Sequence, residues 1–383
     1  MRFVIIIFFT FISISCTIHE DAVNSTISVD NSKGIKGNSF NDFFSDLRIV
    51  ELESNDQSRL SNSKKVLLGV DSTILILDRS IQKSLRIFDY KGSYRNSITS
   101  DAVSELLHNK TEIIDFDVKD DMIYLLLKGY KGLLVYNFDC KYVKTISLQF
   151  IANRIKVTKN NDFLVYKTFE ASNLEDKRFF NNLMLVDSTG KLKYKKKPFE
   201  INTGKRIFFD VEEPLNGRGS ELFYTECLND TIFIFDENLN NKNYLIIDYK
   251  IKSIDKGKFK NLEDIQTIFS DLGNKKPTGI CYFNNDNYST SFIFLQNARS
   301  CYFLENKLNK KSVVTSYFTV GANDGYLPIP IYSSENNVIG IVDESSLTGI
   351  PFDAAKQKLY KGIFDDIIYK GKTYMYFAKL NTK

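Results

Sequence analysis

The chain has 383 residues, with 51 Lys and Arg against 47 Asp and Glu, which gives a formal net charge of +4. Only two residues are histidines, His19 and His108, so metal sites built from clustered histidines are excluded by count. The charges are scattered, and the one short basic run, residues 193–197, alternates on an expected outer strand, so nucleic acid is not expected as a partner.

The first residues have the features of an export signal. Met1 and Arg2 precede an apolar run over residues 3–14, the length of the apolar segment of a signal peptide. This run is too short to span a bilayer, which needs roughly 20 apolar residues. Small residues then precede Cys16, and the segment resembles the lipobox of bacterial lipoproteins. We expect residues 1–15 to be a signal peptide and Cys16 to carry a lipid; the alternative is an ordinary cleaved signal with an incidental cysteine.

A polar segment follows Cys16. Residues 17–41 are rich in Asp, Ser, Asn, Gly and Thr and show little apolar periodicity, which predicts that residues 16–45 form a flexible, lipidated tether. The acidic pair Glu20-Asp21 matches a surface-export signal of some lipoproteins of Gram-negative bacteria. The expected location is the outer membrane, facing the periplasm or exposed on the surface, with the N-terminal lipid as the contact to the membrane.

A strand, an acidic turn and a second strand recur along the chain. The turns contain Asp89, Asp139, Asp187 and Asp236, which are 50, 48 and 49 residues apart. A fixed period of this size in a strand-rich chain indicates a radial or stacked repeat. Four short strands with their turns need about 40–50 residues, as in the blade of a β-propeller. We interpret these aspartates as turn residues, not as a binding site.

Successive sets of four strands can be followed in chain order. They are expected at residues 65–98, 113–148, 154–199, 206–249 and 278–320. Between the last two sets, residues 253–276 carry apolar side chains at three- and four-residue steps, which predicts an amphipathic helical insertion.

The last repeat is incomplete in the sequence. Residues 329–332, 338–342 and 374–380 supply three strands, and residues 353–369 have the pattern of a second helical insertion. The segment Leu47–Glu53 is a spare strand that would complete this blade and remove two free sheet edges. The prediction for residues 46–383 is an all-β fold, a six-bladed β-propeller closed by an N-terminal strand, with two short helical insertions.

Several segments resemble one known group, the six-bladed β-propeller lipoproteins of Gram-negative bacteria, which have NHL-like repeats. The matching segments are Asn229–Phe233, Leu245–Tyr249, Ile49–Glu53, Phe88–Gly92 and Phe377–Leu380, so the resemblance covers about Arg48 to Leu380. In the expected family pattern, a Gly-Pro-Gly-Glu loop joins the first two blades; this chain has residues 99–108 instead. The resemblance implies the propeller fold and carries over no catalytic residue.

Four cysteines remain besides Cys16. Cys281 and Cys301 would lie on the first and third strands of one blade, about 9–10 Å apart, which exceeds the roughly 7 Å limit between the Cα atoms of a disulfide. Cys140 and Cys227 would lie two blades apart. We expect free, mostly buried thiols.

Candidate chemical groups are few and weakly patterned. His108 is the one histidine of the expected folded body, and no Gly-x-Ser-x-Gly elbow accompanies it. Carboxylate pairs are more consistent with turns and solvated edges than with acid/base chemistry. The remaining candidates are an oxygen-rich turn, a glycine-containing loop with an arginine, and an aromatic platform. These candidates are Asp120-Asp121, Glu212-Glu213, Asp365-Asp366, Asn284–Asn287, Asn216–Gly219 with Arg218, and Tyr130.

The sequence therefore predicts no catalytic residue, no cofactor and no metal. It favours a lipid-anchored binding or interaction module of the cell envelope whose partner, a protein or a glycan, is not specified by any motif. The alternative is an enzyme acting on a polysaccharide or a small ester, with carboxylates and His108 at the mouth of the channel. A third reading is a structural subunit of an envelope complex, with an apolar patch on the helical insertions.

Overall fold

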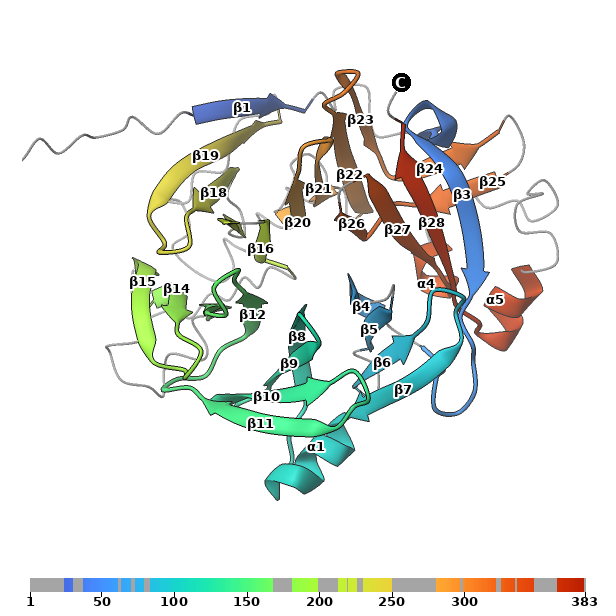
Figure 1. Cartoon of the computed structure of the whole chain (residues 1–383). Coiled ribbons are helices and arrows are strands. Elements are labelled where there is room, and N and C mark those ends of the chain that lie inside the picture. Colours follow the sequence, from blue (N-terminus) through green and yellow to red (C-terminus); the bar gives the residue numbers. More distant parts are fainter. Residues whose placement is uncertain are drawn as a thin grey trace, which may run out of the picture.

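The computed structural model describes residues 24–29, 37–60, 63–69, 73–78, 83–167, 181–198, 213–218, 220–225, 230–249, 280–296, 299–321, 325–334, 336–347 and 364–381. Strands dominate these residues and form sheets arranged around one centre (Figure 1). No helix among the described residues is both long and apolar enough to cross a membrane.

The first three blades are regular four-stranded antiparallel sheets. Their middle strands are near-continuous apolar runs, as in Ile74–Asp78 and Gly132–Asn137, so side chains on both faces of each sheet pack against neighbouring blades. The strands are β4 (Ser63–Leu68), β5 (Ile74–Asp78), β6 (Ser84–Phe88) and β7 (Tyr94–Thr99); β8 (Ile113–Lys119), β9 (Met122–Leu127), β10 (Gly132–Asn137) and β11 (Tyr142–Ser147); and β12 (Arg154–Val157), β13 (Phe163–Tyr166), β14 (Asn181–Val186) and β15 (Leu192–Pro198).

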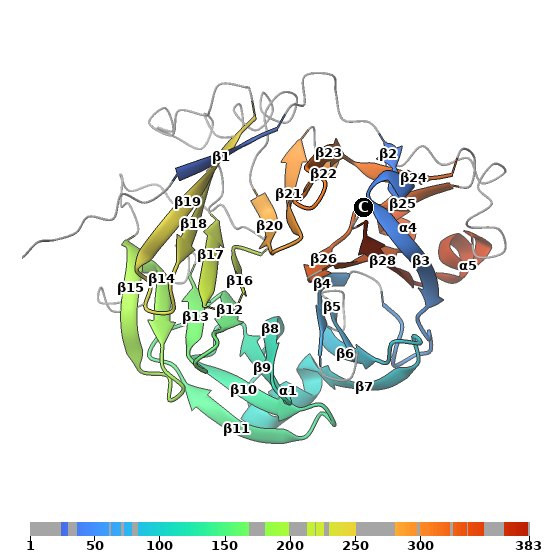
Figure 2. The same ribbon diagram turned by 45° about the horizontal axis from the view of Figure 1, so that its top comes forward.

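Three further sheets continue around the ring. The first is β16 (Leu215–Arg218), β17 (Glu221–Thr225), β18 (Thr231–Phe235) and β19 (Asn241–Asp248), and the second is β20 (Ile280–Asn285), β21 (Ser289–Gln296), β22 (Arg299–Asn306) and β23 (Lys311–Thr315). The third contains β26 (Tyr332–Ser334), β27 (Asn337–Val342), β28 (Tyr374–Leu380) and β3 (Phe44–Glu51). Figures 1 and 2 show β4, β8, β12, β16, β20 and β26 nearest the centre.

A seventh sheet makes the predicted count of six blades wrong. The described residues form seven sheets, and the seventh has three strands, β2 (Asn38–Ser39), β24 (Tyr317–Val320) and β25 (Gly325–Pro328). It lies outward of β28 and next to β3 (Figure 2). The sequence predicts residues 317–320 as the end of the fifth blade, because a strand of only four residues that directly follows that blade has no repeat signal of its own.

Strand β3, near the start of the chain, and the last strand, β28, lie in one sheet. β28 pairs antiparallel with β3, with Tyr376 opposite Ile49 and Met375 opposite Val50. This is the pairing expected for the spare N-terminal strand. The Tyr374 hydroxyl also donates to a carboxylate oxygen of Glu51 over 3.3 Å, and Lys372 forms an ion pair of 2.7 Å with the same carboxylate.

Part of the predicted tether is in regular structure. Strand β1 (Asn24–Ser28) pairs in parallel with β19 as a fifth strand of that blade, and Val29 directly after it is fully buried. Farther along, β2 pairs with β24, and the 3-10 helix η1 (Phe40–Asp42) precedes β3. The flexible-tether prediction is therefore wrong for these residues, while residues 1–23 lie outside the described part.

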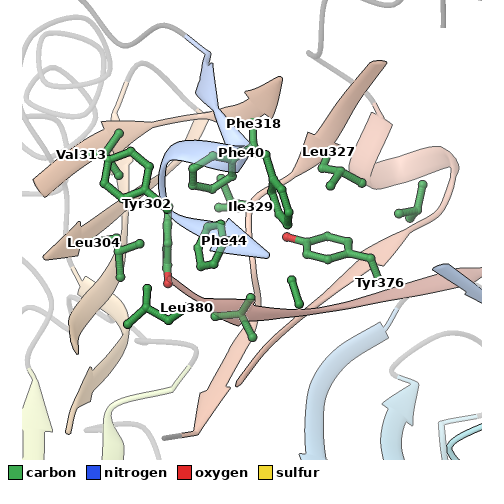
Figure 3. Packing of buried hydrophobic residues seen from close by; sticks show 14 of the residues in the cluster. Phe40, Phe44, Tyr302, Leu304, Val313, Phe318, Leu327, Ile329, Tyr376 and Leu380 are labelled. Atoms are coloured by element: carbon green, nitrogen blue, oxygen red, sulfur yellow. The ribbon is translucent and has the colours of Figure 1, made fainter. Parts of the chain in front are cut away.

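The large aromatic cluster explains how β2, η1 and β3 are held. Phe40 and Phe44 are almost fully buried, and their ring centroids lie 5.0 Å apart. Phe44 also packs edge to face on Phe318 of the seventh sheet, with centroids 5.2 Å apart (Figure 3). The Tyr376 hydroxyl donates to the carbonyl oxygen of Pro328 over 2.7 Å. Burial of such rings contributes roughly 1.5–3 kcal/mol each.

The recurring turns are built as expected, with one shift of register. Asp89, Asp187 and Asp236 each accept hydrogen bonds from the backbone N–H groups two and four residues later, at 2.8–3.0 Å. In the second blade this place belongs to Asn137, whose side-chain oxygen accepts from Lys141 N–H over 2.9 Å. Asn can replace Asp in this position because both side chains close such turns. Asp139, two residues later, is therefore not equivalent to the other three aspartates.

The helices differ from the predictions in number. Residues 99–108 were read as a loop, but α1 (Ser100–Leu107) forms there, with the Thr99 side chain accepting from Ala102 N–H over 3.1 Å at its start. The expected second insertion contains α5 (Phe364–Lys370), and α4 (Glu344–Leu347) follows β27. The first expected insertion, residues 253–276, lies outside the described residues.

Candidate functional site

A polar cavity lies where the six innermost strands converge. Its volume is about 360 Å³, and every one of the strands β4, β8, β12, β16, β20 and β26, or the residues beside them, contributes to its wall. The charged and polar lining residues are Lys65, Asp117, Lys156, Glu213, Asn216, Asn284, Asp286, Tyr332 and Ser333. A single site therefore collects side chains from distant parts of the sequence.

Lys65 forms ion pairs with two carboxylates at the cavity. Its ammonium lies 2.9 Å from Asp115 Oδ1 and 3.2 Å from Glu213 Oε2, so it joins β4 to β8 and to the residues before β16. Burial opposes the charge on Lys65, but the carboxylates of Asp115, Glu213 and Asp117 outweigh this effect and raise its pKa above the ordinary value. Lys65 is therefore a permanent cation inside the cavity wall.

Two aspartates of β8 connect this strand to β12. Asp115 and Asp117 point the same way because they are two residues apart on a strand. The other oxygen of Asp115 accepts from Ile155 N–H over 2.8 Å, and Asp117 accepts from Val157 N–H over 2.6 Å. Lys156 lies 3.2 Å from Asp117 and keeps its side chain partly exposed to the cavity. Both buried carboxylates thus satisfy backbone donors on the neighbouring blade as well as a lysine.

The opposite wall is formed by a turn of the fifth four-stranded blade. Asp286 accepts from Tyr288 N–H over 2.7 Å, from Ser289 N–H over 2.8 Å and from the Asn284 side chain over 3.0 Å. The Asn216 side chain donates to the carbonyl oxygen of Phe283, which ties β16 to β20. The turn lies two residues later than expected: Asn284 and Asn285 end β20, and the turn runs from Asp286 to Ser289, whose carbonyl accepts from Asp286 N–H over 2.8 Å. Asn284 and Asp286 line the cavity.

The sequence candidates are otherwise dispersed. His108 is exposed at the C-terminal end of α1, where its φ of 51° closes the helix, and it does not line the cavity. Asp120 and Asp121 are exposed in the turn after β8, and Tyr130 packs against the core between the first two blades. These residues and the cavity belong to different parts of the ring.

Of the remaining candidates, the pairs Glu212-Glu213 and Asp365-Asp366 and the residue Arg218, only Glu213 is found at the cavity in the described part of the chain. Glu213 lines the cavity, whereas Glu212 lies outside the described residues. Asp366 bonds Lys370 over 2.6 Å and Lys372 over 3.0 Å, and these bonds lower its pKa. Residues 216–218 are in β16, so the prediction of a loop there is wrong. The side chain of Arg218 lies outside the described part.

The two cysteines whose side chains the structure describes, Cys140 and Cys301, form no disulfide. Cys301 is buried, and Cys140 is partly buried, where burial and the nearby Asp139 raise the pKa of its thiol to about 12. Such a thiol is unreactive at neutral pH. Cys16 and Cys227 lie outside the described residues, as does the side chain of Cys281. Within the described part of the chain, no three His, Cys, Asp or Glu residues are grouped as a metal site would require.

Sequence reasoning missed the charged residues Lys65, Asp117 and Lys156 of the cavity wall, and Asp115, which supports Lys65. A signal was present in the sequence, because each of these residues lies on the first strand of its set. Asp115 and Asp117 are also charged residues two positions apart among the apolar residues of 113–118. First strands line the centre of a propeller. Charged residues on first strands are therefore the sequence pattern that indicates a site at the centre.

The fold and the central cavity define this molecule as a β-propeller protein. The chain belongs to the family described as "Domain of unknown function (DUF4934)", whose model matches residues 24–370. This is the family that the comparisons show; the expected likeness to NHL-repeat lipoproteins stays a prediction.

Among solved structures, the chain is similar to one described as a "Putative exported protein" from Bacteroides fragilis NCTC 9343. The two share 13% identity, the match covers 94% of this chain and 100% of that one, and the TM-score is 0.66. A member of the DUF4221 family from Bacteroides vulgatus matches with 10% identity over 88% of this chain and 97% of that one, with a TM-score of 0.47. At 13% identity, the likeness to the Bacteroides fragilis protein shows a shared fold alone. A search of curated proteins found no match.

Proposed function

We propose that this protein is an exported binding module that holds a small polar ligand in its central cavity. The observation that carries the proposal is the convergence on one cavity of charged and amide side chains from five blades, with Tyr332 and Ser333 contributed by a sixth. Pockets of this kind, with a few convergent polar groups, are where small molecules bind. The description of the Bacteroides fragilis protein and the signal-like residues 1–15 support export.

The proposal includes anchoring at the outer membrane through a lipid on Cys16. The resemblance of the preceding residues to a lipobox supports it. The strand β1 begins at Asn24, so only a short segment separates Cys16 from the first strand on the propeller. The pairing of β3 with β28 supports a ring closed by an N-terminal strand.

Binding fits the cavity better than the alternative of an enzyme for polysaccharides or small esters. Glycoside hydrolysis needs one carboxyl group that gives a proton and another that acts as base or nucleophile. Here Asp115, Asp117 and Glu213 are each paired with Lys65 or Lys156, so these carboxylates are engaged as acceptors in ion pairs. His108, the expected partner for ester chemistry, is exposed on α1 instead.

A capture experiment tests this function. The full chain with Cys16→Ser is incubated with small-molecule extract from a bacterial culture and filtered, and the compounds released on denaturation are identified by mass spectrometry. We expect at least one enriched compound, and we expect Lys156→Ala to lose it.

The matched control is Lys193→Ala. Lys193 also pairs with an aspartate, Asp162, over 2.6 Å, but this pair does not line the cavity. The control should retain the compound. Equal retention by both variants, or no enriched compound at all, contradicts a ligand site in the cavity. Turnover of the compound into a product would establish the enzyme alternative instead.

A further inference from the structure

The charges in the cavity disfavour an anionic ligand. Lys65 and Lys156 contribute two positive charges, and both are engaged by carboxylates at 2.9–3.2 Å. The lining carboxylates Asp117, Glu213 and Asp286 outnumber these lysines. Asp115, fully buried beside Lys65, adds a further negative charge next to the cavity. An anion would therefore have to break an existing ion pair and approach an excess of negative charge, which costs binding free energy on both counts.

The same carboxylates are already supplied with donors, so none of them needs a bound cation. Asp115 accepts from Lys65 and from Ile155 N–H, and Asp117 accepts from Lys156 and from Val157 N–H. Asp286 accepts three hydrogen bonds from neutral groups of its own turn. A cationic ligand would compete with these donors. The charge pattern is therefore best matched by a ligand without net charge.

The remaining capacity of these groups suits hydroxyl groups. A carboxylate can accept about four hydrogen bonds and an ammonium can donate three, so each Lys–Asp pair keeps free donor and acceptor sites after pairing. The pair Lys156–Asp117 presents both kinds side by side, at 3.2 Å. A hydroxyl both donates and accepts, so two adjacent hydroxyls on one ligand can bridge such a pair.

The cavity also has an apolar component and a limited size. Val118, Leu68, Ile331 and Tyr332 line it beside the polar groups. These surfaces can contact the C–H faces of a ring that carries hydroxyls at its edges. A volume of about 360 Å³ is at the low end of the roughly 300–1,000 Å³ of ligand pockets, so a short ligand fits and a long chain does not.

We propose that the cavity binds a neutral polyhydroxylated compound of the saccharide class, held by the Lys156–Asp117 pair, Asn284 and Asp286 with Tyr332 beside the ring. This inference rests on the proposed function and names its ligand class. It predicts a preference for neutral sugars over their charged derivatives of the same shape.

The test measures binding of matched sugars to the full chain with Cys16→Ser. The probes are glucose, galactose and cellobiose as neutral sugars, glucuronate as an anion and glucosamine as a cation. Saturation-transfer NMR detects binding, and calorimetry gives the Kd. We expect at least one neutral sugar to bind, and glucuronate and glucosamine to bind at least tenfold more weakly than glucose or galactose.

Variants locate the site. Asp117→Asn keeps an oxygen for Val157 N–H and removes the charge, and Lys156→Ala removes the partly exposed donor. Each should weaken sugar binding about tenfold or more. The control variants Asp162→Asn and Lys193→Ala alter an equivalent pair outside the cavity and should leave the Kd unchanged. Thermal unfolding of all four variants verifies that they are folded.

The outcomes separate this inference from the proposed function. Tighter binding of glucuronate or glucosamine than of neutral sugars overturns the ligand class. So does capture of a compound from culture extract by a protein that binds none of the neutral sugars. Unchanged sugar binding in Asp117→Asn and Lys156→Ala overturns the site. Failure to capture any compound from the extract contradicts the proposed function itself.

Discussion

The turns on the outside of the blades and the strands around the centre use the same residue type for different purposes. Asp89, Asp187 and Asp236 recur at the period of the repeat, and each accepts N–H groups of its own turn. Asp115 and Asp117 belong to no repeat, yet they hold lysines and the backbone of the next blade. The comparison teaches that repetition marks residues that build every blade, whereas the candidate chemistry lies at positions where the blades differ.

The first prediction tests the central side of this comparison and has the largest expected effect. Asp115 is fully buried, and Asp115→Ala removes a partner of Lys65 and the acceptor for Ile155 N–H. Breaking a buried ion pair from one side costs about 3–5 kcal/mol. We expect a loss near 3 kcal/mol, because Glu213 still lies 3.2 Å from Lys65. Urea unfolding followed by circular dichroism measures it.

Asp89→Ala is the matched variant on the outer side. This aspartate closes an exposed turn through bonds to Lys91 N–H and Ser93 N–H, and water can replace both. Its loss should shift the urea midpoint much less than the loss of Asp115. Equal shifts for the two variants would contradict the distinction between the central and the outer aspartates.

The second prediction concerns the glycine of the same turns. Gly190 has a φ of 88°, and a Cβ added there would lie 1.9 Å from the Ser147 carbonyl oxygen on β11 of the preceding blade. Gly190→Ala therefore combines a left-handed backbone penalty with a clash against backbone, together about 2–4 kcal/mol. Chemical unfolding of the purified variant gives the loss in free energy of unfolding.

Cys140 supplies the control for this prediction. It has the equivalent place in the second blade and already carries a side chain at a φ of 59°. Cys140→Ala should cost about 1 kcal/mol or less, since only a partly buried sulfur is removed. If Gly190→Ala were as mild as Cys140→Ala, the close approach of this turn to the neighbouring blade would not matter for stability.

Much of the fold follows from sequence because its signals are local. The apolar runs and the spacing of the turns are enough to predict the strands and a propeller. The incomplete last set of strands predicts the pairing of residues 47–53 with 374–380. The seventh sheet could not be predicted in this way. Its strand β2 is two polar residues, Asn38 and Ser39, which pair with β24 from the far end of the chain. Pairing of this kind is decided by tertiary packing around Phe40 and Phe318.

The candidate site was less predictable because it is made of residues that are distant in sequence. In the sequence, Glu213 is part of an ordinary acidic pair with Glu212. No local pattern indicates that its carboxylate lies 3.2 Å from the ammonium of Lys65. That contact depends on how the ring brings β4 and β16 to the same centre. The sequence could place charged residues on first strands, but only the closed geometry shows which of them meet.

The third prediction has the smallest expected effect and compares two turns directly. Burial opposes ionisation of Asp236, but hydrogen bonds from Asn240 and Asn238 outweigh it and lower the pKa of Asp236 below 3.8. A lowered pKa means that the carboxylate adds stability above the unfolded value and loses it as pH falls through the folded value. Asp236→Asn should therefore destabilise the protein slightly at pH 6, and this difference should vanish toward pH 2–3.

The second blade allows the reverse change at the equivalent position. Asn137 accepts Lys141 N–H there without a charge, so Asn137→Asp should stabilise the protein at pH 6 and lose this gain over the same acidic range. The effect should be smaller than that of Asp236→Asn, because Asp139 lies two residues away and repels a new carboxylate. Urea midpoints of both variants at pH 6, 4 and 2.5 measure the two trends. Differences that do not change with pH would show that side-chain shape, not charge, decides between Asp and Asn in these turns.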